Sequence, residues 1–286
     1  MNGISKIAVQ VHGHRGAAGE WPQNSLQGFL YAVDLGVDAL EMDVVISKDR
    51  KVVVSHEPYM ASAYMLTPRG EAISHKKERD YNLYHMEYSE IKKFDAGSKW
   101  DFRFFRKKRI KTHKPTLEEV ILAVENRIGN KQLKPVTYSV EIKSVPREYG
   151  EFQPQPEDFI QLVMQILKKH QIEHRLIIQS FDSNLLNILH SKYPGVKVSY
   201  LVEHGDTIKN LEKLNFKPDF YSPHHTAIQS RALVDFLHHK NIGVFTWTVN
   251  RKRDIRKMLH FGVDAIISDY PKRVIKEQQK LKSSKK

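Results

Sequence analysis

The run Glu41-Met42-Asp43 places two carboxylates at the end of a predicted buried strand. Side chains alternate along a strand, so Glu41 and Asp43 point to one side and Met42 points to the other. Two carboxylates on one buried face repel each other and are costly to desolvate, and a divalent cation with hard oxygen ligands removes both problems. Glu141 stands at the end of a later predicted strand and could complete a three-carboxylate metal site. The alternative is a carboxylate pair that neighbouring Lys or Arg side chains neutralise.

Two histidines are placed to move protons beside these carboxylates. His14 directly follows the first predicted strand, and His56 ends a short hairpin that returns toward the level of Glu41. Imidazole exchanges protons near neutral pH, so the pair could act as general acid and general base. Arg15 and Lys143 could bind phosphate oxygens. Each motif alone also fits a surface turn or a structural role, but their joint placement at successive strand ends favours chemistry.

A few further side chains are weaker candidates. Trp247 ends an apolar run and could form an apolar wall against a substrate, although a core position explains it equally well. His224 and His225 follow another strand end, and substrate contact is one of two interpretations for them. His12 shares a face with His14 but lies deeper, which favours a hydrogen-bonded core histidine.

Buried strands alternate with helical stretches through most of the chain. The predicted strands are 6–12, 38–43, 137–142, 175–180, 197–202, 218–222, 243–249 and 264–268. Between them, Asn24–Gln27 and Thr116–Glu119 have capping-box spacing, Gly36 suits a left-handed helix end, and Pro156 suits a first helical turn. Eight strands with intervening helices predict a (β/α)₈ TIM barrel, an α/β fold whose active site lies at the C-terminal strand ends. A doubly wound open sheet is the structural alternative, but no glycine-rich phosphate-binding sequence follows the first strand.

One segment breaks the alternation. Only twelve residues separate Asp43 from His56, which is too short for a helical crossover, so residues 51–56 are predicted to return antiparallel as a β-hairpin. Residues 58–114 are mostly polar and lack barrel periodicity, which predicts a small insertion over the barrel mouth. We therefore expect one catalytic barrel domain over 1–271, with 58–114 inserted, and a basic C-terminal helix end and tail over 272–286.

Composition excludes several classes of protein. The 286 residues include 46 Lys and Arg against 33 Asp and Glu, 40% are hydrophobic, and there is no cysteine. Collagen-like, disulfide-stabilised and wholly disordered chains are thereby excluded. No apolar run is long enough to span a membrane, and the N-terminus shows no signal-peptide apolar region. We expect a cytoplasmic protein, or a periplasmic one if a signal peptide has been removed.

The formal net charge of +13 is concentrated in two segments, Arg103–Lys114 and Lys272–Lys286. Two short basic segments do not make the broad basic face of a duplex-binding protein, so no nucleic-acid partner is expected. A solvated loop and a frayed tail explain them. The functional alternative is attraction of an anionic substrate or an anionic membrane surface, although membrane contact is not expected. The oligomeric state is left open.

Taken in order, these residues resemble the glycerophosphodiester phosphodiesterase family, a family of TIM barrels similar to the phosphatidylinositol phospholipases C. The resemblance covers nearly the whole chain and rests on a series of motifs. They are His14-Arg-Gly16, Pro22-Gln-Asn-Ser25, Glu41-Met-Asp43 with Val44 and Asp49, Val52-Val-Val-Ser-His56, Pro115-Thr-Leu-Glu-Glu119, Glu141-Ile-Lys143, Ser180-Phe181, Trp247-Thr-Val-Asn250, Gly262-Val-Asp264 and Ser268-Asp-Tyr-Pro271.

The resemblance implies metal-dependent hydrolysis of a glycerophosphodiester to sn-glycerol 3-phosphate and an alcohol such as choline, ethanolamine or glycerol. It makes His14 and His56 the acid/base pair and places Arg15 and Lys143 around the phosphate. It makes Glu41, Asp43 and Glu141 the ligands of one divalent cation. Ca²⁺ or Mg²⁺ suits three carboxylates better than Zn²⁺, since both histidines are needed for proton transfer. Which histidine is the acid stays open, as does attack by water against attack by the glycerol 2-hydroxyl through a cyclic phosphate.

Two departures from the family pattern concern substrate and rate. Gln23 replaces the usual glutamate, and Glu57 replaces the usual aspartate after the second histidine.

Two alternative functions are kept beside glycerophosphodiester hydrolysis. One is a barrel phospholipase acting on lysophospholipids, which needs an apolar patch near the mouth. The inserted segment could supply that patch through Tyr59, Tyr64, Phe102, Phe104 and Phe105. The other is a degenerate barrel that binds phosphoesters without hydrolysing them.

Overall fold

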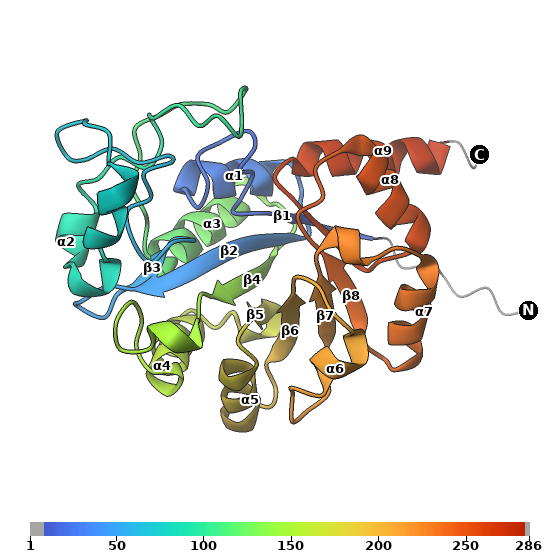
Figure 1. Ribbon diagram of the computed structural model, residues 1–286. Helices are drawn as coiled ribbons and strands as arrows, with labels where there is room; N and C mark the ends of the chain where they lie inside the picture. Colours follow the sequence, from blue (N-terminus) through green and yellow to red (C-terminus); the bar gives the residue numbers. More distant parts are fainter. Residues whose placement is uncertain (1–8, 284–286) are drawn as a thin grey trace, which may run out of the picture.

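A closed barrel of parallel strands forms the centre of the molecule, as the computed structural model of residues 9–283 shows (Figure 1). β1 pairs in parallel with both β9 and β2, so the sheet closes on itself and the open-sheet alternative is wrong. The predicted TIM barrel is confirmed. The strands are β1 (Gln10–Gly13), β2 (Ala39–Ile46), β3 (Val52–Val54), β4 (Thr137–Ile142), β5 (Leu176–Ser180), β6 (Lys197–Val202), β7 (Phe220–Pro223), β8 (Gly243–Thr246) and β9 (Ala265–Ser268).

The observed strands match the predicted ones, with differences at their ends. Residues 6–8 of the first predicted strand lie outside the described residues. β2 runs three residues beyond the predicted 38–43, because it continues into the hairpin and pairs there with β3. β8 stops at Thr246, since Trp247 turns into the loop above the barrel and keeps only a bridge to His224.

Helices pack around the outside of the barrel, as Figure 1 shows. They are α1 (Leu26–Asp34), α3 (Leu117–Lys131), α4 (Pro156–Lys169), α5 (Ser183–Lys192), α6 (Thr207–Leu211), α7 (Arg231–His239), α8 (Lys252–Phe261) and α9 (Pro271–Ser283). The short helix α2 (Tyr88–Ile91) lies in the inserted segment instead. Short 3₁₀ helices are η1 (His75–Asp80), η2 (Leu83–His85), η3 (Pro146–Glu148), η4 (Glu173–Arg175) and η5 (His225–Ala227). None of the helices in residues 9–283 is both long and apolar enough to cross a bilayer.

Helix ends follow local chemistry. Thr116 and Glu119 form a reciprocal capping box at the start of α3, as their spacing predicts. The corresponding prediction at Asn24–Gln27 is wrong by one residue. Ser25 caps α1 by accepting a hydrogen bond from the Gly28 amide, and Asn24, at φ +53°, turns its side chain toward the barrel mouth instead.

The main core lies between barrel and helices, and a smaller one fills the barrel interior. Ile177, Phe245 and Ile267 pack inside the barrel. His12 is fully buried against Phe245, with ring centroids 4.8 Å apart, and its Nε2 lies 3.0 Å from Gln10 Oε1. Burial lowers the pKa of His12 to about 4, so this histidine stays neutral and has the core role expected of it.

The predicted hairpin is present and sets the height of His56. Val44 pairs with Val54 in antiparallel register, and the Ser55 amide donates to the Asp43 carbonyl at 3.0 Å. The inserted segment 58–114 then packs onto this hairpin. Although mostly polar in sequence, it buries a small apolar core of its own. That core contains Val45, Val53, Met60, Ala61, Tyr64, Met65, Ile73, Leu83, Ile91, Phe94 and Ala96. The domain limits 1–271 and 272–286 stay a prediction.

Gly16 lets the chain turn from β1 into the loop before α1. It has φ +86°, and a Cβ added there would lie 2.7 Å from the Gly28 carbonyl carbon and 2.9 Å from the Phe29 nitrogen. Both a strained backbone angle and a backbone clash therefore oppose any side chain at this position.

We predict that Gly16→Ala lowers the free energy of unfolding by about 1–3 kcal/mol. Gly129→Ala is the matched control, because Gly129 lies in α3 with open space around its Cβ position. The control should raise the unfolding free energy by about 0.5–1 kcal/mol. Urea denaturation measures both, and a Gly16→Ala protein as stable as the control would contradict the prediction.

Candidate active site

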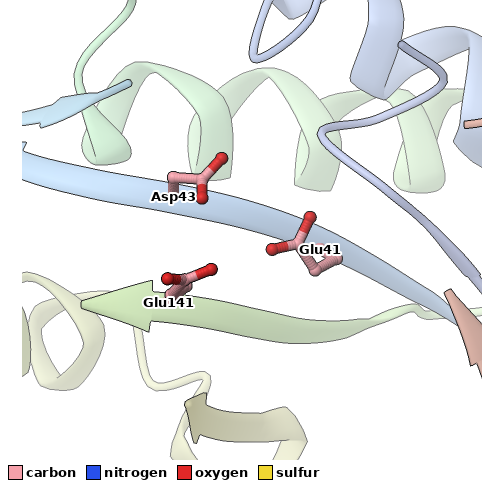
Figure 2. Close-up of side chains that lie close together, drawn as sticks. All are labelled: Glu41, Asp43 and Glu141. Carbon is pink, nitrogen blue, oxygen red and sulfur yellow. The ribbon is translucent and has the colours of Figure 1, made fainter. Parts of the chain in front are cut away.

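Three carboxylates converge at the C-terminal ends of two neighbouring strands (Figure 2). Glu41 and Asp43 come from β2 and Glu141 from β4, with Asp43 directly opposite Glu141 in the strand register. One oxygen of each lies within 4.8 Å of the others, and all three side chains are buried. Met42 faces the outer core instead, as the alternation of strand side chains predicts.

Two cations lie against this cluster. Arg15 Nε is 3.2 Å from Asp43 Oδ2, and Lys143 Nζ is 2.6 Å from Glu141 Oε1 and 3.9 Å from Asp43 Oδ1. Burial lowers the pKa of Lys143, but Glu141 and Asp43 outweigh burial and raise it above its ordinary value. Burial raises the pKa of Asp43, but Arg15, His56 and Lys143 together outweigh burial and hold that pKa well below its usual range.

Neutral groups donate hydrogen bonds to the carboxylate oxygens of Glu41 and Asp43. The Arg15 amide and Gln179 Nε2 each donate to Glu41, at 2.9 and 3.0 Å, and Asn24 Nδ2 donates to Asp43 at 2.8 Å. Burial and then the neighbouring Asp43 raise the pKa of Glu41 to about 7. The cluster thus carries more negative charge than its surroundings compensate.

The chemistry of this donor set fits a divalent cation. Asp43 Oδ1 is a buried acceptor with no hydrogen-bond partner, a rare situation for a carboxylate oxygen. When all three carboxylates are ionised, they exceed the permanent cations paired with them, Arg15 and Lys143, by one negative charge. Hard oxygen ligands in this number are typical of Ca²⁺ and Mg²⁺ sites.

His14 is held from behind by a carboxylate. Its Nδ1 lies 2.6 Å from Asp269 Oδ1, and Asn250 Nδ2 donates to the other oxygen of Asp269 at 2.6 Å. Because Asp269 accepts at Nδ1, the opposite nitrogen, Nε2, is directed into the site, 3.9 Å from Glu41 Oε2. Burial lowers the pKa of His14, but Asp269 and Glu41 outweigh it and raise that pKa above its usual value.

His56 is held by a carboxylate in the same way. Its Nδ1 lies 3.0 Å from Glu57 Oε1, and Tyr64 donates its hydroxyl to Glu57 Oε2 at 2.6 Å. Burial raises the pKa of Glu57, but His56, Lys114 and Tyr64 together outweigh burial and lower that pKa, so Glu57 stays ionised. The Glu57 that replaces aspartate therefore still reaches the histidine.

A buried lysine supports the His56 side. Lys114 Nζ donates to Ser55 Oγ at 2.6 Å and to the Tyr64 hydroxyl at 3.1 Å, so it lies behind the Tyr64–Glu57–His56 chain. Burial lowers the pKa of Lys114 to about 8.

A pocket of about 110 Å³ brings the predicted residues together. It is lined by His14, Arg15, Glu41, His56, Glu141, Lys143, Gln179, Phe181, Leu201, Trp247, Thr248 and Ile267. Asp43 belongs to the same site through the carboxylate cluster, so all eight predicted site residues meet there. Trp247 donates from Nε1 to the Ser222 carbonyl at 2.8 Å and packs edge-on against Phe181. His224 packs on Trp247, but neither it nor His225 lines the pocket.

Several contributing residues were not among the sequence candidates. Gln179 and Asp269 lie at the ends of β5 and β9. The strand-end position that identified the other candidates would also have identified these two. Asn24 and Lys114 gave no such signal, because only the folded chain brings them to the site. Gln23 accepts a hydrogen bond from Arg15 Nη1 at 3.1 Å, so the neutral amide still orients the guanidinium.

Comparisons with known proteins agree with this geometry. The model of the "Glycerophosphoryl diester phosphodiesterase family" matches residues 14–273. A glycerophosphodiester phosphodiesterase of Caldanaerobacter subterraneus is 30% identical over 266 residues, covering 93% of this chain and 96% of the relative.

Two solved structures share the fold. One from Silicibacter pomeroyi DSS-3 has a TM-score of 0.84 at 28% identity, covering 96% of this chain and 94% of its own. A phosphodiesterase from Oleispira antarctica, in complex with the product sn-glycerol-3-phosphate, has a TM-score of 0.74 at 23% identity and covers 94% of this chain and 96% of its own.

The depressed pKa of Lys114 predicts a pH-dependent stability. Between pH 8 and about 10.5 the unfolded chain binds a proton at Lys114 that the folded chain has lost. Because the unfolded state then holds more protons, this group's contribution to the unfolding free energy rises with pH across that window. We predict that the wild type gains about 1–3 kcal/mol relative to Lys114→Met between pH 8 and pH 10.5.

Urea denaturation of both proteins at several pH values measures this difference. Lys111→Met, at an exposed position three residues away, is the control and should follow the wild type. A constant stability difference between wild type and Lys114→Met across the window would contradict the prediction.

Proposed function

The chain belongs to the glycerophosphoryl diester phosphodiesterase family, and we propose that it hydrolyses glycerophosphodiesters to sn-glycerol 3-phosphate and an alcohol. One observation carries this proposal. Two histidines, each oriented by a carboxylate, share one site with three buried carboxylates whose combined charge exceeds that of the cations beside them. The product complex of the Oleispira antarctica phosphodiesterase supports this choice of substrate.

Glu41, Asp43 and Glu141 are the proposed ligands of one divalent cation, Ca²⁺ or Mg²⁺. When bound, such an ion stabilises the negative charge that develops on the phosphoryl oxygens. The ion also reverses the sign of the cluster. With the three carboxylates ionised as its ligands, the two positive charges of the ion exceed the one negative charge left after Arg15 and Lys143 are counted. These five side chains and the ion then sum to one positive charge, which matches a singly charged phosphodiester.

Arg15 and Lys143 are the proposed contacts of the phosphate. Both line the pocket, and both already lie against the carboxylate cluster, so their charged ends stand where an anion bound beside that cluster would be. The Arg15 guanidinium is fixed between Asp43 and Gln23, which restricts its orientation before substrate arrives. Such preorganised donors stabilise charge without reorganising during the reaction.

His14 and His56 are the proposed proton carriers. With Nδ1 bonded to Asp269 or Glu57, each ring can use Nε2 for transfer. One Nε2 accepts the proton of the attacking hydroxyl as the new P–O bond forms. The other donates its proton to the alcohol oxygen as the second P–O bond breaks. With water as the nucleophile, this exchange completes the hydrolysis. With the glycerol 2-hydroxyl as the nucleophile, a water must then open the cyclic phosphate, and the two histidines exchange roles for that second step. Either histidine could begin as the acid.

Trp247 is the proposed apolar wall for the organic part of the substrate. Its indole is fixed by the Ser222 carbonyl and by Phe181, which is also exposed at the pocket.

The side chains of the site span His14 to Asp269, which supports residues 1–271 as the catalytic unit, with 58–114 inserted.

We predict that His14→Ala and His56→Ala each lower kcat by about 10²–10⁴-fold, because each removes a general acid or base. Release of glycerol 3-phosphate from glycerophosphocholine, with Ca²⁺ or Mg²⁺ present, measures the rate. His75→Ala, at an exposed position in the inserted segment, is the control. A folded His14→Ala protein with the wild-type rate would exclude the assigned role.

We predict that Ca²⁺ or Mg²⁺ raises the melting temperature, since binding at one hundred times the dissociation constant stabilises a folded protein by about 2.7 kcal/mol. Glu141→Gln should lose most of this shift, because it removes one charged ligand. Glu118→Gln, at the surface of α3, should keep it. Differential scanning calorimetry with metal and with chelator measures the shift, and an equal shift in Glu141→Gln would argue against the assigned ligands.

A further inference from the structure

One turn of the inserted segment presents aromatic rings to solvent. We call residues 99–111 the rim loop; in Figure 1 it belongs to the green loop that projects above α1. Phe102 is 79% exposed, Phe105 74% and Trp100 38%. Scattered single apolar side chains are common on protein surfaces, but a group of three large rings within six residues marks an interaction site.

A buried ion pair holds the turn, and the rings of Phe102 and Phe105 lie outside it. Asp101 and Lys107 are both buried, and their charged ends lie 2.7 Å apart. Arg103 donates to both oxygens of Asp101 at 2.9 Å, and the Phe104 amide donates to the Asp101 carbonyl at 3.0 Å. These bonds fix the turn, so the exposed rings of Phe102 and Phe105 are held outward by structure.

Exposed cations surround the rings. Arg106, Lys108, Arg109 and Lys111 are all exposed, while the one acid of the rim loop, Asp101, is buried and paired. The surface around Phe102 and Phe105 is therefore positive. Aromatic rings with a basic surround are typical of segments that lie at the interface of an anionic bilayer.

The rim loop contacts residues that neighbour the carboxylates behind both proposed proton carriers. The Phe104 ring lies 6.2 Å from the ring of Tyr270, which follows Asp269 in the chain. The Arg103 guanidinium lies 5.8 Å from the ring of Tyr64, which bonds Glu57. A surface that held the rim loop would therefore also lie close to the mouth of the pocket.

We propose that the rim loop docks the barrel mouth onto an anionic lipid bilayer, with Phe102 and Phe105 in the interfacial layer and the four exposed cations on the headgroups. Charge complementarity and the outward rings favour a bilayer. A single-stranded nucleic acid also offers phosphates and faces for stacking, but its binding sites combine aromatic side chains with a positive groove that follows the strand, whereas the rim loop is one short turn.

The test is co-sedimentation of the full chain with vesicles of phosphatidylcholine containing 30% phosphatidylglycerol, at about 0.1 M salt, where surface charges still interact over roughly 10 Å. We expect binding to these vesicles and at least tenfold weaker binding to pure phosphatidylcholine. Phe102→Ser with Phe105→Ser, and separately Arg106→Gln with Arg109→Gln, should each weaken binding at least tenfold, since each cation near an anionic surface contributes about fivefold.

Matched controls separate the rim loop from other surfaces. Ile208→Ser removes an exposed apolar side chain of α6, and Lys272→Gln with Lys276→Gln removes two exposed cations of α9; both proteins should bind as the wild type does. Hydrolysis of soluble glycerophosphocholine without vesicles should be the same in all variants, because none of these residues lies in the pocket. Binding is measured without turnover, so failure of docking and failure of the proposed hydrolysis are separate results.

Three outcomes would overturn the proposal. The first is equal binding to vesicles with and without phosphatidylglycerol. The second is vesicle binding that the α9 variant weakens and the rim-loop variants do not, which would place docking at the C-terminal helix. The third is retention by single-stranded DNA, but not by vesicles, that the rim-loop variants abolish.

Discussion

Burial of three carboxylates within a few ångströms of one another is the constraint on which the rest of the site depends. Glu41, Asp43 and Glu141 project from adjacent strands whose register cannot change without moving the whole barrel. Such a cluster is tolerated only if cations and hydrogen-bond donors surround it. Arg15 and Lys143 supply charge, and the surrounding amides supply donors, yet Asp43 Oδ1 is left without a hydrogen-bond partner. The unbalanced charge makes the pocket suited to a divalent cation and then to an anion.

The barrel topology brings the two proposed proton carriers to the same pocket as this cluster. His14 follows β1, and closure of β1 against β9 brings Asp269 behind it. His56 follows the β2–β3 hairpin, which returns the chain to the level of Asp43. The inserted segment then closes over that hairpin and contributes Tyr64 and Lys114 behind Glu57. Both histidines thus share one arrangement, in which a carboxylate at Nδ1 leaves Nε2 for proton transfer, although they come from different parts of the fold.

Local patterns were sufficient to predict the barrel, the hairpin and the strand-end positions of the site residues. Alternation places Glu41 and Asp43 on one face whatever the tertiary structure, and the short connection to His56 leaves no room for a helix. The remaining features depend on contacts between distant residues. In the sequence Lys114 is one of several cations in a basic segment, and nothing there distinguishes it from the others. It is buried because the inserted segment packs against Ser55. The sequence predicts Asn24 as a helix cap. In the structure Ser25 caps the helix, and the side-chain amide of Asn24 donates to Asp43 instead.

The central claim is that the three carboxylates share one divalent cation, and anomalous diffraction from crystals grown with Mn²⁺ tests it most directly. Mn²⁺ accepts the same oxygen ligands as Mg²⁺ and Ca²⁺. The predicted result is a single anomalous peak within coordinating distance of Glu41, Asp43 and Glu141. A cluster without such a peak at saturating Mn²⁺, with Lys143 still paired to Glu141, would contradict the claim.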